Sequence, residues 1–318
     1  MANELKRSKR ITFDGKFEEE INPINLKYLA KYKIDAELRG LSEKSIYNYE
    51  RDLKQWMSYL NKEQFNASVL DVTDNDIEEF IYFCKQQGNN IERLKRRISS
   101  ISNIYKFLRK KKEIKENPCE FLDRPKKGLP VVVQTFLTFD QYELMKQKLI
   151  DNGDLQLYVF AMLAIDTMGR VNALSNITWA QIDLNERTID DVLEKEGKIV
   201  TLYFGEETKE LLDQLKQYRQ ENNIDDKGYL FFSKEDGVDS VVAGTLFKWT
   251  KKIGEMIGVP SLHPHDFRHS GAQLRKLRGM KIEDISALLS HSGLDVTRKH
   301  YLRQDKAEMR KKVDQFKI

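Results

Sequence analysis

Residues 263–302, HPHDFRHSGAQLRKLRGMKIEDISALLSHSGLDVTRKHYL, decide how the rest of the sequence is interpreted. His265 and Arg268 are three residues apart, so on a helix their side chains share one face. A span with the pattern of two helices joined by a turn follows, then His291 directly ahead of a Ser-Gly break, and then Tyr301. Two imidazoles, a guanidinium and a phenol could therefore surround one anion.

This set of groups suits chemistry at a phosphate. A guanidinium is always charged, and its fork of N–H donors matches phosphate oxygens. A phenol is a feasible nucleophile if its surroundings lower its pKa from about 10. The segment contains no pair of carboxylates placed for acid–base work. The sequence therefore predicts phosphoryl transfer through a covalent phosphotyrosine.

The order His-x-x-Arg, a second His, and a Tyr about ten residues later resembles the C-terminal signature of the tyrosine recombinases, the phage integrase and Xer-like family. The resemblance implies that His265, Arg268, His291 and Tyr301 are catalytic. It also implies a mainly α fold of two domains. These are an N-terminal helical core-binding bundle and a mostly helical integrase-type catalytic domain with a small antiparallel sheet.

Two further catalytic residues follow from the same resemblance. Residues 166–184, DTMGRVNALSNITWAQIDL, resemble the segment that carries the first catalytic arginine of the family, here Arg170. The sequence departs from the family at Ala173, where a glutamate is usual, which puts the local hydrogen bonding in doubt. Two expected strands, 188–193 and 199–204, are joined by a turn that resembles the family hairpin with the catalytic lysine, here Lys195.

Two alternatives remain open at this hairpin. Lys198 lies at the start of the returning strand and could take the role of Lys195 in a tighter turn. A purely structural interpretation is a solvated turn, in which Glu194 and Glu196 are weak ionic partners of the two lysines.

Composition sets the broad class. The chain has 318 residues, enough for two domains with separate cores, and its 40% hydrophobic content is ordinary for a soluble globular protein. No apolar run reaches the length of a membrane span, and the N-terminus lacks the apolar core of a signal peptide. The neighbours of Cys84 and Cys119 show no metal-ligand spacing, so two buried thiols in a reducing cytoplasm are expected.

The order of patterns along the chain gives the expected domains. A polar tail, 1–22, precedes four amphipathic helical runs in 23–116, which predict a small helical bundle. The resemblance implies that this bundle is the DNA-binding, core-binding domain. A proline-containing stretch, 117–133, is the expected linker, and 134–318 is the expected catalytic domain with its C-terminal tail.

The fourth helical run, Ile91–Leu108, is strongly basic, and no acid occurs between Arg93 and Lys112. A helix lying along a DNA backbone would explain this run, although a solvated face is the alternative. With the linker lysines, the candidate DNA-binding residues are Arg93, Lys95, Arg96, Arg97, Ser99, Ser100, Asn103, Lys126 and Lys127.

Other classes of function fit less well. His265 and His269 have a known metal-ligand spacing, but no Glu or Cys provides a third ligand and Arg268 would repel a dication. A DNA-binding regulator without chemistry leaves the catalytic set unexplained, and a type IB topoisomerase-like enzyme shares the chemistry but not the short spacing from His291 to Tyr301. We expect no nucleotide cofactor, because the phosphotyrosine conserves the bond energy. We expect no metal, because the arginines can stabilise the charge of the phosphate.

The expected partner is double-stranded DNA, and the resemblance implies a homotetramer on paired DNA sites. The target sequence, the need for an accessory factor and the choice between integration, transposition, excision and chromosome resolution are not determined by the residues.

Overall fold

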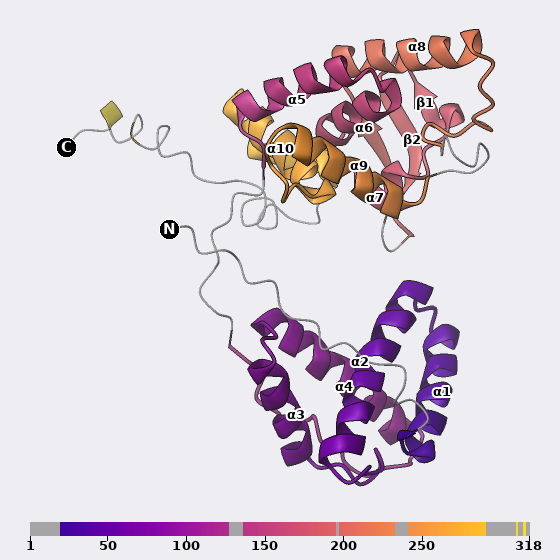
Figure 1. Cartoon of the computed structure of the whole chain (residues 1–318), viewed down its shortest axis with the longest axis vertical. Coiled ribbons are helices and arrows are strands. Elements are labelled where there is room, and N and C mark those ends of the chain that lie inside the picture. Colours follow the sequence, from indigo (N-terminus) through magenta and orange to yellow (C-terminus); the bar gives the residue numbers. More distant parts are fainter. Residues whose placement is uncertain are drawn as a thin grey trace. The chain divides into compact units, whose positions relative to one another are not determined.

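The computed structural model describes residues 20–126, 136–194, 197–232 and 241–290, together with 310, 314 and 315. The chain divides into two compact units, Met1–Val131 and Val132–Ile318 (Figure 1). Both units are built mainly of helices, and the second contains a small antiparallel sheet, as predicted. No helix in these ranges is long and apolar enough to cross a membrane.

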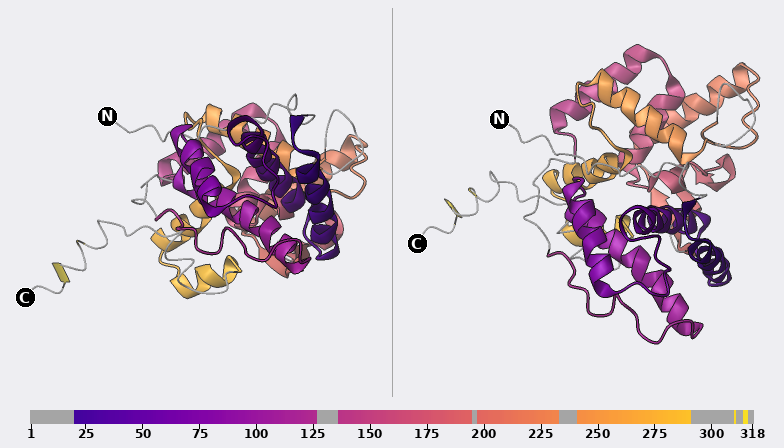
Figure 2. Two further views of the ribbon diagram at one scale, coloured as in Figure 1. Left: turned by 90° about the horizontal axis from the view of Figure 1, so that it is seen from below. Right: turned by 60° about the horizontal axis from the view of Figure 1, so that its bottom comes forward.

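The first unit is a bundle of four helices, which confirms the four amphipathic runs. They are α1 (Pro23–Leu38), α2 (Glu43–Glu63), α3 (Asp74–Gln86) and α4 (Ile91–Lys110). Each begins after a residue whose side chain accepts a hydrogen bond from the first turn: Asn22, Ser42, Thr73 and Asn90. The view at the right of Figure 2 shows these helices, in indigo to purple, gathered in one group.

Aromatic and aliphatic side chains fill the centre of this bundle. Trp56 of α2 and Tyr105 of α4 are both buried, and their rings meet edge to face with centroids 5.7 Å apart. Cys84 of α3 lies in the same core, and Cys119, beyond α4, packs against it as well. Both cysteines are free and buried, as predicted.

We expect both thiols to be inert in the folded protein. Burial raises the pKa of Cys84 to about 11 and that of Cys119 to about 12. A thiol whose pKa is raised by two units has about a hundredfold less thiolate at neutral pH, and the thiolate is the reactive form. Titration with a disulfide reagent should therefore be at least about a hundredfold slower in buffer than in denaturant. Fast native labelling of either cysteine would contradict its place in this core.

The second unit is built around one apolar helix, α6 (Leu155–Asp166). Its residues from Gln156 to Ile165 are buried, which confirms the predicted core helix. Three helices pack on it: α5 (Phe139–Asn152), α8 (Glu206–Glu221) and α10 (Pro264–Leu277) (Figure 1). The remaining elements of this unit include α7 (Val171–Leu174), α9 (Ala243–Met256) and α11 (Ile282–Leu288).

The sheet is a meander in the order β1 (Ile182–Asp183), β2 (Thr188–Leu193) and β3 (Ile199–Tyr203). Strands β2 and β3 confirm the predicted hairpin, and their register pairs Ile189 with Leu202 and Val192 with Val200. A bulge lies between Ile189 and Val192, so two residues three apart both face the core. The hairpin is thus fixed to the core on one side.

Candidate active site

Arg170 is placed by a sharp turn at the end of α6. Thr167 donates its hydroxyl to the carbonyl oxygen of Leu163 (2.7 Å) and accepts the N–H of Gly169 (3.1 Å). Met168 has a φ of +53°, and a Cβ on Gly169 would lie 2.7 Å from the side chain of Leu174. A side chain at 169 would therefore have to displace the buried side chain of Leu174, and the turn leaves Arg170 as the residue that precedes α7.

Arg268 is placed by the close crossing of α10 and α6. A Cβ on Gly271 would lie 2.1 Å from the carbonyl oxygen of Ile165, so only glycine allows the two helices this approach. Arg268, one turn before Gly271, is 1% exposed. It donates to the carbonyl oxygens of Met168 and Leu289, the latter at 2.6 Å. One buried guanidinium thus joins the Arg170 turn to the end of α11.

The predicted two-helix span after Arg268 is present as α10, a turn and α11. The turn includes Gly279 with a φ of +93°, a conformation that favours glycine. A small apolar cluster of Ala272, Ile285 and Leu289 packs on Met168. Packing as well as hydrogen bonding therefore connects this span to the turn that carries Arg170.

Glu194 brings the two arginines together. Its Oε2 accepts a hydrogen bond from Nη1 of Arg170, and its Oε1 lies 3.9 Å from Nη1 of Arg268. The glutamate side chain is 2% exposed. The interpretation of Glu194 as a solvated partner of the hairpin lysines is therefore wrong, because the carboxylate turns inward to the guanidinium groups. The residue was missed as a site residue, although the absent acid at Ala173 was a signal that Arg170 needed another carboxylate.

Of the two histidines in α10, His265 lies exposed in its first turn, and His269, one turn later, is buried. The side chain of His265 is exposed, and its ring meets that of His269 edge to face at 4.9 Å. Nδ1 of His263 accepts the N–H of His265, and Asp266 accepts the N–H of His263, so both groups cap the helix. Burial raises the pKa of Asp266, while the hydrogen bond from His263 opposes that shift.

Lys198 links the β2–β3 hairpin to the residue that follows α11 and Leu289. Its Nζ donates to the carbonyl oxygen of Ser290 at 2.9 Å, so the hairpin reaches the residue directly before His291. Lys195, His291 and Tyr301 lie outside the described residues. Within the described ranges, no three His, Cys, Asp or Glu side chains are grouped so that they could hold a metal ion.

The basic helix α4 has an interior and an exterior side. Arg97 is 1% exposed, its Nε donates to Asn89, and Ser100 is fully buried. These two residues, predicted to contact DNA, instead belong to the bundle interior, because they fall on the same helical face as the core residues Ile101 and Ile104. The candidate DNA-binding residues of α4 that are exposed or half-buried are Arg93, Lys95, Arg96, Ser99 and Asn103.

A buried carboxylate of α2 holds two of the outer arginines of α4 in place. Asp52 of α2 is 1% exposed and accepts from Arg93 (2.9 Å), Arg96 (3.0 Å) and the hydroxyl of Ser100 (3.1 Å). It offsets part of the charge repulsion along α4 and fixes two arginines in place. Of the predicted linker lysines, Lys126 is exposed and Lys127 lies outside the described residues.

We expect the double variant Lys95→Gln/Arg96→Gln to bind duplex DNA more weakly and with less salt dependence. Each lost phosphate contact should lower the slope of log affinity against log salt by about 0.9. Fluorescence anisotropy over a salt series measures it, with Lys27→Gln on α1 as the control. An unchanged slope would return α4 to the solvated-face interpretation.

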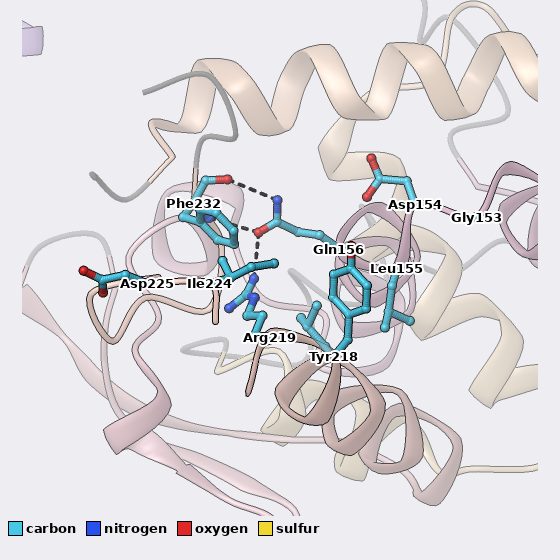
Figure 3. A pocket seen from close by; sticks show the side chains of 10 residues that line it. Gly153, Asp154, Leu155, Gln156, Tyr218, Arg219, Ile224, Asp225 and Phe232 are labelled. Carbon is cyan, nitrogen blue, oxygen red and sulfur yellow. Dashed lines mark hydrogen bonds between the residues drawn. The ribbon is translucent and has the colours of Figure 1, made fainter. Parts of the chain in front are cut away.

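The second unit also contains a pocket of about 660 Å³, which is separate from the arginine pair. Figure 3 shows the amide of Gln156 beside Phe232 and Arg219. Gln156 bonds both backbone groups of Phe232 and accepts from Arg219 at 2.8 Å. Neither Arg170 nor Arg268 lines the pocket, and the polar groups named here bond to one another. We assign its buried arginine a structural role.

Comparison with known proteins gives matches in both units. The model of the phage integrase family matches residues 135–308, more than half of the chain, and that of its N-terminal SAM-like domain matches residues 28–112. A tyrosine recombinase of Thermosipho africanus is 24% identical over 295 residues, which cover 87% of this chain and 96% of the relative.

Solved structures share the fold. A lambda integrase (75–356) dimer bound to a COC′ core site has a TM-score of 0.71 at 18% identity, covering 88% of this chain and 96% of that chain. A lambda integrase tetramer bound to a Holliday junction has a TM-score of 0.69 at 18% identity, covering 88% of this chain and 79% of that one.

Proposed function

Because the chain belongs to the phage integrase family, we propose that it is a site-specific recombinase that cuts and rejoins DNA through Tyr301. The observation that carries the proposal is the convergence of Arg170 and Arg268 on one buried carboxylate, beside the segment that leads to His291. Two fixed guanidinium groups at one place suit a phosphodiester that gains charge in the transition state.

The proposed reaction is a transesterification. The phenolic oxygen of Tyr301 attacks phosphorus and forms a 3′-phosphotyrosine, while the bond from phosphorus to the 5′-oxygen breaks. His265 accepts or shuttles the phenolic proton, and Lys195 protonates the leaving 5′-oxygen. Arg170 and Arg268 bind the non-bridging oxygens. The 5′-hydroxyl of a partner strand reverses the step.

His291 completes the proposed set by donating a hydrogen bond to a phosphate oxygen. The reaction exchanges one phosphoester for another, so the proposal includes no nucleotide cofactor. The proposal also includes no metal, because the cationic side chains neutralise the charge of the phosphate.

We further propose that residues 23–116 and 134–318 are the two DNA-contacting domains, joined by a linker at 117–133. A clamp around duplex DNA needs two halves and such a connection. The proposed active assembly is a homotetramer on two DNA sites, supported by the lambda integrase tetramer on a Holliday junction, which has the same fold. We also propose that the protein acts in the cytoplasm, in keeping with DNA as its substrate.

Covalent trapping tests the function. Bound sequences are first selected from a random duplex library, and the selected site is rebuilt with a nick close to each candidate cleavage position. After cleavage, the short 5′-hydroxyl fragment diffuses away, so the adduct accumulates. An SDS-resistant complex, with the DNA mapped to a tyrosine by mass spectrometry, is expected.

The same experiment decides between this function and its alternatives. A DNA-binding architectural protein would select a sequence but give no adduct with any nicked duplex. A type IB topoisomerase-like enzyme would give the adduct and relax supercoiled DNA, yet would not exchange strands between two copies of the selected site.

A further inference from the structure

We infer that Glu194 is a positioning residue, which sets the spacing and charge of the arginine pair and ties that pair to the hairpin that carries Lys195. The inference rests on the proposed function, since it concerns how the arginines meet a phosphate. It starts from one observation. The carboxylate of Glu194 is almost fully buried between two guanidinium groups that belong to separate segments, and one of its oxygens faces Arg170 while the other faces Arg268.

Charge balance explains why a carboxylate is needed here. Two guanidinium groups near each other repel, and Arg268 is almost completely removed from water, where repulsion is strongest. An ionised Glu194 between them offsets one of the two positive charges of this arginine pair. Without Glu194 the two guanidinium groups lose the carboxylate that they share, and their repulsion increases.

The position of Glu194 indicates that it stays in place when DNA binds. Its side chain is 2% exposed, whereas the side chain of Arg170 is 34% exposed, so a phosphate can reach Arg170 from the solvent side. Its backbone N–H donates to the carbonyl oxygen of Lys198 at 2.8 Å, at the closure of the β2–β3 hairpin. The carboxylate is therefore less accessible from solvent than the guanidinium group of Arg170.

The same residue couples the general acid to the arginines. Glu194 directly precedes Lys195, and Lys198 of the same turn is bonded to Ser290. The two ends of the turn are thus both fixed. Glu194 joins one end to the arginine pair, and Lys198 joins the other to the residue Ser290 beyond α11. A change at Glu194 should be felt by the groups that bind the phosphate and by the group that protonates the leaving oxygen.

The test compares three variants on the nicked duplex. Glu194→Gln keeps the shape and removes the charge, Glu194→Asp keeps the charge and shortens the side chain, and Glu206→Gln is the control. Glu206 is an exposed carboxylate that also pairs with an arginine, Arg187, at 2.9 Å. We expect Glu194→Gln to slow adduct formation by about tenfold to a hundredfold, the range typical of residues that orient a reacting group, without weaker DNA binding. Glu194→Asp should be the faster of the two, and the control should match the parent.

A double-mutant cycle separates positioning from general loss of structure. Because Glu194 contacts Arg170 directly, Glu194→Gln should slow adduct formation by a smaller factor in the Arg170→Ala background than in the parent. Multiplicative effects, or a Gln variant as fast as the parent or faster than the Asp variant, would overturn the inference. If the Gln variant does not fold, judged by its melting temperature, the cycle is run with Glu194→Asp. If the parent gives no adduct, the proposed function fails instead.

Discussion

Replacing Tyr301 with phenylalanine is expected to abolish the covalent protein–DNA complex while leaving DNA affinity unchanged. The phenol supplies the attacking oxygen, and phenylalanine has no oxygen with which to form the 3′-phosphodiester. The arginines and α4 still hold the DNA, because none of their contacts depends on the hydroxyl. An SDS gel with the nicked duplex measures the adduct, and a mobility shift measures binding.

The matched control for this variant is Tyr203→Phe, because Tyr203 is an exposed phenol on β3 in the same unit. It should form as much adduct as the parent. His300→Ala should do the same, because this neighbour of Tyr301 has no role in the proposed reaction. An SDS-resistant complex formed by the Tyr301→Phe protein would remove Tyr301 from the mechanism.

Lys195→Ala should cleave ordinary DNA about a hundredfold to ten-thousandfold more slowly than the parent, the usual contribution of a general acid. The leaving alkoxide needs a proton, since its conjugate acid has a pKa far above neutrality. A strand with a 5′-bridging phosphorothiolate releases a thiolate instead, which needs no proton. The rate of the variant should therefore recover on the sulfur-substituted strand, measured by single-turnover adduct formation.

Lys198→Ala is the comparison that decides which lysine is the acid. The Lys198 amine donates to the carbonyl oxygen of Ser290, so we expect its loss to loosen the hairpin but to change little on either substrate. If sulfur rescue occurs with Lys198→Ala and not with Lys195→Ala, the role of general acid passes to Lys198.

Much of the fold could be predicted because its signals are local. The capping residue Thr73 and the apolar stripes of the first unit predict its helices without knowledge of the tertiary structure. Helix α6 contains almost no polar residue, which identifies it as a core element. The β2–β3 hairpin follows from two short apolar runs around a charged turn.

The candidate site could be predicted only in part, because its contacts are not local. The inward turn of Glu194 depends on the approach of Arg268 from α10, which no pattern around residue 194 reveals. The burial of Arg97 and Ser100, in contrast, was implied by the apolar residues at Ile101 and Ile104, but the run of positive charge concealed it. Charge alone therefore identified the correct helix and assigned too many of its residues to the surface.

The hydrogen bonds of Arg268 also set the order in which the protein can become active. Arg268 and Met168 are 100 residues apart in the chain, and Lys198 and Ser290 are 92 apart. Contacts between such distant residues form late, because a long loop must first be closed. A ribosome-bound chain that ends before α10 lacks Arg268, so it has no arginine pair. Synthesis itself therefore delays DNA cleavage until almost the entire chain has been made.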